Sequence, residues 1–232
     1  MILLLFVSAA AALSAYKANT GAQTKGKCIP PTLACLKAAG ITLHLDDEET
    51  DVFAARLCNE KTERYLEFGA GGSTLTAAYC DVREIVSLDN AAAWQKKVGE
   101  HAIWNKTRSH VQQLHVGLGE VGSYSRPITN DSFADFIHYS HGALRYTQGT
   151  FDVILIDGRF RVASALVSMQ RMRGDSALFI HDYTARSAYR VLEQVLDIED
   201  RVGTLVQFRL PKVIDVVAVE RLLRQYIHNV EK

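Results

Sequence analysis

The segment that most constrains the fold is the apolar run FDVILI at residues 151–156, which is followed by Asp157 and Gly158. Such a run is expected of a central parallel strand that is buried on both faces of its sheet. Four further strand-like segments, at residues 64–68, 84–88, 111–116 and 177–180, alternate with helical patterns at 73–79, 92–103, 163–173 and 187–196. This alternation predicts an α/β fold built on a doubly wound, mostly parallel sheet.

The two ends of the chain depart from this alternation. Residues 201–202 and 205–208 are separated by Gly203-Thr204, which predicts a tight reversal and hence an antiparallel strand at one edge of the sheet. Residues 213–230 are expected to form a strand and then a terminal helix. Near the other end, Pro30-Pro31 predicts a short helix that ends before Gly40, and residues 46–59 predict a second helix with acids in its first turn.

Residues 1–15 (MILLLFVSAAAALSA) contain no charged side chain, and a polar linker follows at residues 17–27. An apolar stretch of about 15 residues is typical of a signal-peptide core, because a membrane-spanning helix needs ~20. No Lys or Arg precedes the stretch, so its orientation in a membrane stays open. We therefore expect residues 1–27 to be a signal peptide or membrane anchor with its linker, and residues 28–232 to be the folded domain.

The predicted location is accordingly the lumen of the secretory pathway, or a membrane to which the N-terminus anchors the protein. Sequons at Asn105 and Asn130 suit this route. The alternative is a cytoplasmic protein whose first residues form a buried or frayed helix. Lys plus Arg and Asp plus Glu number 26 each, so the overall charge does not favour nucleic acid as a partner.

The four cysteines show no zinc-binding spacing. If the chain is lumenal, Cys28 and Cys35 could form a local disulfide. For Cys58 and Cys80, buried free thiols are at least as good an interpretation.

Polar or glycine-rich segments stand at the ends of four predicted strands, at residues 67–73, 89, 157–161 and 181–183. Ligands of doubly wound sheets bind outside the carboxyl ends of the strands, near the switch in strand order. We therefore expect these four segments to form one site.

The first segment, EFGAGGS at residues 67–73, is a glycine-rich turn between a strand and a helix. Glycines let the backbone approach a ligand where a Cβ would clash, and the helix that follows offers unpaired N–H groups. The spacing departs from G-x-G-x-x-G, because Thr74 stands where the third glycine belongs. Asp89 ends the next strand, where its carboxylate can accept both ribose hydroxyls of a nucleoside cofactor.

Together with the acid Glu67 in the strand, this turn resembles the first motif of the class I S-adenosylmethionine-dependent methyltransferases, which have a Rossmann-like fold. The resemblance covers residues 64–208, most of the chain. It implies that S-adenosylmethionine is the cofactor, that Glu67 helps to hold its methionine moiety through the amino group, and that Asp89 binds its ribose. The residues that would pass under the cofactor are Gly69, Ala70, Gly71, Gly72 and Ser73.

The second half of the expected site combines Asp157, which ends the buried strand, with His181 and Asp182 at the end of the next strand. The two acids could hold a divalent cation, such as magnesium, that orients a substrate hydroxyl and makes it more acidic. Alternatively, His181 or Asp157 acts as a general base without a metal, or the acids are purely structural. The metal arrangement resembles O-methyltransferases of the catechol and sugar-macrolide kinds. Those enzymes usually follow the second acid with Asn or another acid, whereas here Tyr183 follows it.

Arg159 and Tyr183 are the residues that we assign to the substrate. Arg159 could clamp an anionic group such as a carboxylate or phosphate, or else pair with a surface acid, and Arg161 is expected at the surface. The insertion at residues 117–149 is rich in aromatic and histidine side chains, which suit a lid over a sugar or ring or simply pack the loop. These are Tyr124, Phe133, Phe136, His138, Tyr139, His141 and Tyr146.

These features predict an S-adenosylmethionine-dependent O-methyltransferase that acts on a hydroxyl of a sugar, a glycan or another small molecule. A nicotinamide-dependent oxidoreductase is one alternative, disfavoured by the missing third glycine and by the lack of a Tyr-x-x-x-Lys pair after the central strands. A non-catalytic Rossmann-like binding protein is the other. The oligomeric state is left open.

Overall fold

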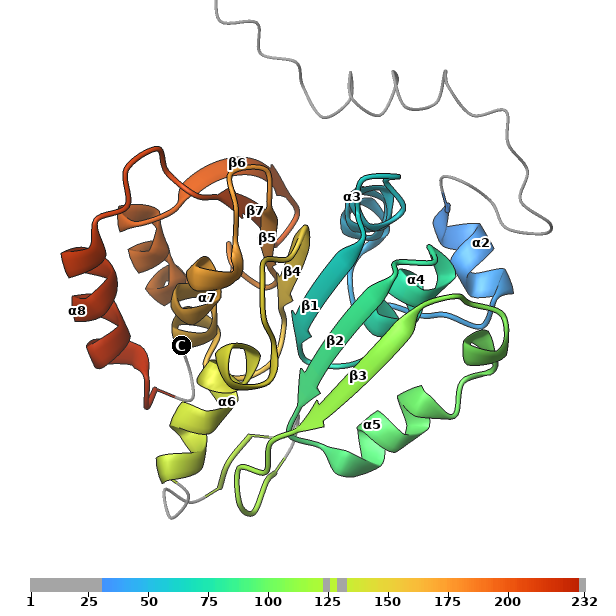
Figure 1. The fold of residues 1–232 in the computed structure, drawn as a ribbon, viewed down its shortest axis with the longest axis horizontal. Coiled ribbons are helices and arrows are strands. Elements are labelled where there is room, and N and C mark those ends of the chain that lie inside the picture. Colours follow the sequence, from blue (N-terminus) through green and yellow to red (C-terminus); the bar gives the residue numbers. More distant parts are fainter. Residues whose placement is uncertain (1–30, 123–125, 129–132, 230–232) are drawn as a thin grey trace, which may run out of the picture.

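The computed structural model describes residues 31–122, 126–128 and 133–229, which form one seven-stranded sheet between two layers of helices (Figure 1). The predicted leader, Cys28, Tyr124 and Asn130 lie outside the described residues. No helix in these described ranges has both the length and the apolar character needed to cross a membrane.

The sheet has the strand order β3-β2-β1-β4-β5-β7-β6. Strands β1 to β5 pair in parallel, whereas β7 runs antiparallel to both β5 and β6. The prediction of a mostly parallel sheet with an antiparallel edge is therefore confirmed. The strands are β1 (Arg64–Phe68), β2 (Glu84–Asp89), β3 (His110–His115), β4 (Val153–Ile156), β5 (Ala177–Ile180), β6 (Asp197–Val202) and β7 (Leu205–Arg209).

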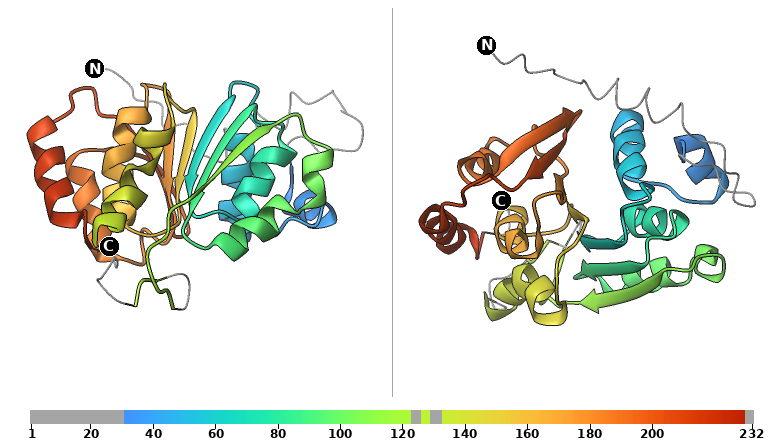
Figure 2. Two further views of the ribbon diagram at one scale, coloured as in Figure 1. Left: turned by 60° about the horizontal axis from the view of Figure 1, so that its bottom comes forward. Right: turned by 45° about the horizontal axis from the view of Figure 1, so that its top comes forward.

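Helices cover both faces of the sheet (Figures 1 and 2). One face is covered by α2 (Leu33–Ala38), α3 (Asp47–Leu57), α4 (Gly72–Tyr79), α5 (Ala92–Gly99) and the 3-10 turn η1 (Ala102–Asn105). The other face is covered by α6 (Phe133–Tyr146), α7 (Arg161–Ser168), α8 (Val216–Tyr226) and the 3-10 elements η3 (Met169–Arg171) and η4 (Ser187–Gln194).

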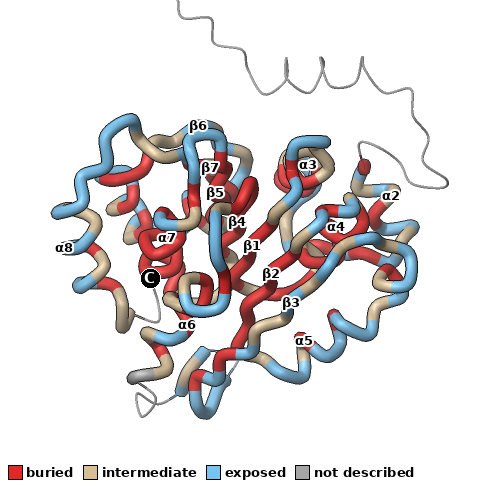
Figure 3. The backbone as a smooth tube through the Cα atoms, in the orientation of Figure 1, coloured by how far each residue is buried: buried red, intermediate tan, exposed pale blue. Residues whose placement is uncertain are grey.

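Side chains of the central strands alternate between the two cores, as the pleat of a strand requires. On β1, Tyr65 packs with α3 and α4, whereas Leu66 and Phe68 pack with α6 and α7. All four residues of β4 are buried, which confirms that the apolar run at 151–156 contains a central strand. Figure 3 shows this buried centre of the sheet and the exposed outer surfaces of the helices.

The insertion at residues 117–149 contains a helix, α6, that the sequence analysis does not predict. Phe136, Tyr139 and Ala143 are all 0% exposed and recur at helical spacing on one face. Phe136 packs on Phe160 with ring centroids 4.9 Å apart. Two of the aromatics considered for a lid are therefore core residues, because burying them against the sheet removes more apolar surface from water than an open loop would.

Four further expectations differ from the structure. The expected helix at 92–103 divides into α5 and η1, and the one at 187–196 is 3-10 in form. The expected helix at 163–173 begins earlier, at Arg161, and ends as η3. The strand expected directly before α8, from residue 213 onward, is absent: Val213 is 84% exposed, and the helix begins after Asp215, whose side chain caps it.

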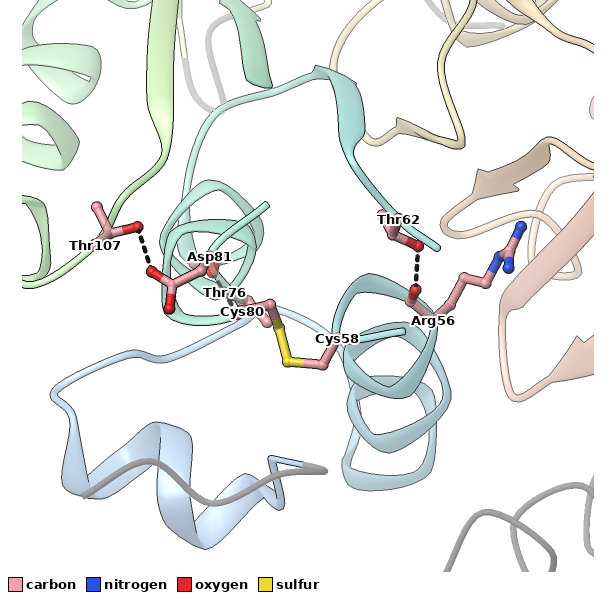
Figure 4. Close-up of a disulfide and its surroundings, with 8 residues drawn as sticks. Arg56, Cys58, Thr62, Thr76, Cys80, Asp81 and Thr107 are labelled. Atoms are coloured by element: carbon pink, nitrogen blue, oxygen red, sulfur yellow. Dashed lines mark hydrogen bonds between the residues drawn. A yellow bond between two sulfur atoms is a disulfide. The ribbon is translucent and has the colours of Figure 1, made fainter. Parts of the chain in front are cut away.

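A disulfide joins Cys58 to Cys80 and corrects the interpretation of these residues as free thiols (Figure 4). Each cysteine follows the last residue of a helix, Cys58 at the end of α3 and Cys80 at the end of α4. The spacing of 22 residues hid the pair, because only the packing of α3 against α4 brings the two ends together. Cys35 is also disulfide-bonded.

The Cys58–Cys80 disulfide should stabilise the domain. For a loop of this length the chain-entropy model gives roughly 3 kcal/mol. We expect urea unfolding of a Cys58→Ser/Cys80→Ser protein to show a loss of about that size, with the sheet retained by circular dichroism. An unchanged midpoint would show that the bond does not form in the folded protein.

Candidate active site

A cavity of about 610 Å³ lies at the carboxyl ends of β1, β2, β4 and β5. The structure brings all four predicted segments together in its wall. The predicted site residues that line it are Gly69, Ala70, Gly71, Gly72, Ser73, Asp89, Asp157, Arg159, Arg161, His181 and Asp182.

The glycine turn is packed tightly against its neighbours. Gly69 has a φ of +99°, and a Cβ there would lie 2.9 Å from the backbone nitrogen of Gly158. A Cβ on Gly72 would overlap the carbonyl oxygen of Thr42, and one on Gly158 would overlap the Tyr139 hydroxyl. The turns after β1 and β4 therefore meet backbone to backbone, which only glycines permit.

Glu67 holds this turn in place from within the protein. Its side chain is fully buried and accepts hydrogen bonds from Tyr65 (2.8 Å), Ser73 (2.6 Å) and Thr74. Burial raises the pKa of Glu67 to about 7, although the hydrogen bonds from Ser73 and Thr74 oppose that rise. Glu67 does not line the cavity, so its predicted direct hold on a cofactor amino group has no support from this geometry.

Asp89 lies at the end of β2 and connects the glycine turn to α5. Its Oδ2 accepts the N–H of Ala70 at 2.8 Å and its Oδ1 accepts the N–H of Ala91 at 2.7 Å. Burial raises its pKa, against the effect of these hydrogen bonds. Each carboxylate oxygen has a further lone pair for a ligand hydroxyl, and Asp89 lines the cavity, so the geometry is compatible with the predicted ribose contact.

Asp157, Arg161 and Asp182 form an ion cluster between the ends of β4 and β5, in which the arginine is buried and the two acids are half-buried. The guanidinium of Arg161 lies 3.1 Å from Asp157 Oδ1 and 3.1 Å from Asp182 Oδ2. It also donates to the backbone oxygens of Gly158 (3.1 Å), Asp157 (3.1 Å) and His181. Arg161 is only 6% exposed, so the expectation that it lies at the surface is wrong.

His181 completes the cluster. Its Nδ1 lies 2.9 Å from Asp157 Oδ1, and its Nε2 faces Glu49 at 3.6 Å and Asp182 at 3.9 Å. Burial alone would lower the pKa of His181, but the hydrogen bond and charge of Asp157, with the charge of Asp182, raise it. The carboxylates on both sides of the ring favour its protonated form, in which it orients Asp157 rather than accepting a proton.

The same geometry tests the predicted magnesium site. Two carboxylates held close together require a cation or a shared proton between them. Here Arg161 stands between Asp157 and Asp182 and supplies that charge. Within residues 31–122, 126–128 and 133–229, no group of three His, Cys, Asp or Glu side chains is arranged to hold a metal ion. The residues therefore do not fit a magnesium site.

Two residues of the site have left-handed backbone without being glycine. Phe160 has a φ of 50° immediately before α7, and Asp182 has a φ of 57° after β5. Such conformations cost of order 1–3 kcal/mol each and tend to cluster at functional sites. Here they lie on either side of Arg161, whose hydrogen bonds to both turns help to hold them.

Tyr183 and the histidines of the insertion lie apart from the cavity. Tyr183 is 2% exposed, packs on Tyr189 and Phe208, and donates to Glu193 at 3.0 Å. It lines neither of the two cavities described at this end of the sheet, and its assignment to the substrate stays a prediction. His138 and Tyr146 are exposed on α6, outside both cavity walls.

Several residues that shape the site are not predicted from the sequence. Trp94 lines the cavity from α5 and donates to the carbonyl oxygen of Ala70 at 2.6 Å. Leu43, His44 and Leu45, which precede α3, form another part of the wall. A tryptophan five residues after Asp89 could have indicated an aromatic contact with the cofactor base. Nothing in residues 43–45 indicates a ligand contact.

Glu49 is the other residue that the sequence does not reveal. It is 2% exposed, and its Oε1 accepts the N–H groups of Thr204 (2.6 Å) and Leu205 (3.1 Å) at the β6–β7 turn. Burial would raise its pKa, but hydrogen bonds from Asp46 and Thr204 outweigh that effect and lower it. Glu49 is therefore ionised, and it links α3, the edge hairpin and His181.

The strand order and the antiparallel β7 define a class I methyltransferase fold, the Rossmann-like variant in which β7 lies between β5 and β6. Dinucleotide-binding sheets have the order 3-2-1-4-5-6, so the nicotinamide-dependent alternative is not favoured. Neither a protein-family model nor a curated protein matches the sequence.

Among solved structures, the chain is similar to a methyltransferase-like protein from Silicibacter pomeroyi, with 24% sequence identity and a TM-score of 0.71. That likeness covers 81% of this chain and 97% of the other. An O-methyltransferase from Bacillus cereus shares 13% identity over 77% of this chain and 88% of its own, with a TM-score of 0.47. The resemblance seen in the sequence is thus confirmed at the level of the fold.

The raised pKa of His181 can be measured directly. We expect an NMR titration of its ring to give a pKa above 6.5, and Asp157→Asn to lower it by removing the adjacent charge. The corresponding stabilisation is present below 6.5 and is lost as pH rises through the raised pKa. The exposed Asp175→Asn serves as the control. A wild-type value at or below 6.5 would contradict the ion cluster.

Proposed function

We propose that the protein is an S-adenosylmethionine-dependent O-methyltransferase that acts on a hydroxyl of a sugar, a glycan or another small molecule. The observation that carries the proposal is the single cavity that the glycine turn and Asp89 share with Asp157 at the carboxyl ends of the strands. The methyltransferase fold supports it.

The cofactor half of the cavity suits a nucleoside with a polar tail. Gly69 and Gly71 present backbone without side chains, and Asp89 offers acceptors for two ribose hydroxyls. Trp94, Leu43 and Leu45 supply apolar surface for the base. When bound, S-adenosylmethionine supplies an electrophilic methyl group on a sulfonium sulfur.

Methyl transfer to an acceptor hydroxyl would form a C–O bond as the C–S bond breaks, with the electron pair of that bond left on sulfur. The hydroxyl proton passes to Asp157. Within the described part of the chain, the ion pairs of this carboxylate use Oδ1, which leaves Oδ2 to accept a proton. His181 and Arg161 fix the orientation of Asp157, and most of the rate enhancement comes from holding the reactants in line.

A lumenal location fits this activity. Disulfides such as Cys58–Cys80 persist in oxidising compartments, and the apolar residues 1–15 favour entry into one. Glycans are assembled in that lumen, so a sugar hydroxyl is the acceptor that we favour. Asn105, in the first sequon, is exposed.

Cofactor binding gives the first test. Calorimetry should show that S-adenosylmethionine or its demethylated product binds and that NAD does not. Asp89→Ala removes charge-assisted bonds of roughly 1.5–3 kcal/mol each, so affinity should fall at least about tenfold. Asp51→Ala, on the exposed side of α3, should bind as the wild type does. Unchanged affinity in a folded Asp89→Ala protein would refute the ribose contact, and binding without turnover on any acceptor would favour a binding protein.

Metal independence gives the second test. Since Arg161 occupies the position between the two acids, methyl transfer should proceed equally with EDTA and with added magnesium. Asp157→Asn should reduce turnover while leaving cofactor affinity nearly unchanged. Activity that disappears in EDTA and returns with magnesium would contradict the assignment of Arg161 as the counter-charge.

A further inference from the structure

A second cavity, of about 730 Å³, adjoins the cofactor cavity and shares Gly122, Arg159, Arg161 and Asp182 with it. An acceptor bound in the second cavity would reach the cofactor cavity where these shared residues line both. The described lining of the second cavity is strongly basic. Its charged members are Arg126, Arg159, Arg161 and Arg186, with Asp182 as the single acid.

Two of these arginines are already balanced by carboxylates. Arg161 lies between Asp157 and Asp182, as described above. Arg186 donates to the same oxygen of Asp182 at 3.2 Å. Arg161, Arg186 and Asp182 are therefore already paired with charged groups of the protein.

Arg159 differs from them. Its backbone is fixed, since its N–H donates to the Tyr139 hydroxyl at 3.3 Å and its carbonyl accepts from Ser164 at 3.3 Å. Its half-buried guanidinium, however, makes no hydrogen bond or ion pair with any residue that the structure describes. Burial lowers the pKa of Arg159, and the charge of Arg161 lowers it further. Both effects indicate a cation that lacks a counter-charge.

We propose that Arg159 binds an oxyanion of the acceptor, namely a carboxylate, sulfate or phosphate group, in this second cavity. The inference rests on the proposed methyltransferase function and adds the class of substrate, an acidic one. The planar guanidinium has five donors in a fixed fork that matches such groups bidentately. Partial burial strengthens the attraction, because water screens the pair less than it would at an open surface.

The same geometry limits where the anion lies on the acceptor. Arg159 follows Asp157 by two residues on one turn after β4, and both line the cofactor cavity. The anion and the methylated hydroxyl therefore lie close together on the acceptor. A neutral acceptor would leave the guanidinium unpaired, and unpaired charge in a partly buried site is what gives such sites their selectivity.

Inorganic phosphate is the probe for the anion site. Calorimetry of the full chain saturated with S-adenosylhomocysteine should show phosphate binding that Arg159→Gln weakens at least about tenfold. Arg159→Lys, which keeps the charge but loses the fork, should lie between the two. Arg190→Gln is the matched control, because it removes an equal charge from an exposed position outside the cavity.

Phosphate titrations without S-adenosylhomocysteine separate this proposal from the proposed function. If S-adenosylhomocysteine does not bind, the methyltransferase proposal fails while the phosphate result still tests Arg159. Equal phosphate binding by wild type and Arg159→Gln would overturn the anion site. If the product instead excludes phosphate and Arg159→Gln weakens S-adenosylhomocysteine tenfold, Arg159 holds the cofactor's own carboxylate and the proposal is wrong.

Turnover measurements then test whether the anion is recognised as part of an acceptor. Matched acceptor pairs, a methyl glycoside and its uronate, sulfated and phosphorylated counterparts, identify which oxyanion is used. The wild type should prefer an acidic member at least about tenfold in kcat/KM, and Arg159→Gln should lose that preference while Arg190→Gln keeps it. A wild type that prefers the neutral member would overturn the proposal.

Discussion

The guanidinium of Arg161 is the group on which the geometry of the site depends most directly. It contacts the backbone of both turns that follow β4 and β5, and it lies between the carboxylates of Asp157 and Asp182. A partly buried ion cluster of this kind is weak evidence for stability, because desolvation offsets much of its attraction. Removing its cation, however, would leave two half-buried carboxylates close together without their counter-charge. Its consequence here is positional, since it holds two strained turns beside the cofactor cavity.

Other interactions extend this constraint through the domain. Glu49, on α3, accepts a hydrogen bond from the β6–β7 turn. It also faces Nε2 of His181, whereas Asp157 contacts Nδ1 of the same ring. The glycine turn after β1 rests against Gly158 and is fixed from inside by Glu67. The hairpin at the antiparallel edge of the sheet therefore helps to position the ion cluster, because it holds Glu49 beside His181. A site held in this way is preorganised, which is the property that methyl transfer by orientation requires.

Much of this was predictable from the sequence, for local reasons. The alternation of strands and helices, the glycine turn and the acids at the strand ends depend on residues close together in the chain, so periodicity and spacing reveal them. Long-range packing decided the rest. The role of Arg161, the Cys58–Cys80 bond and the contact of Glu49 with the edge hairpin join residues that the fold alone brings together. The aromatics of α6 were ambiguous because the same side chains suit a lid or a core, and Phe136 proved to be core.

A crystal structure grown with S-adenosylhomocysteine and magnesium chloride would test the central claim most directly. The account predicts the ribose hydroxyls on Asp89, the thioether sulfur beside the turn that bears Asp157, and Arg161 still between Asp157 and Asp182 with no metal ion there. A magnesium ion that displaces Arg161 and is bound by the two carboxylates would contradict the metal-free site. A cavity at the strand ends that stays empty of S-adenosylhomocysteine at saturating concentration would contradict the proposed function itself.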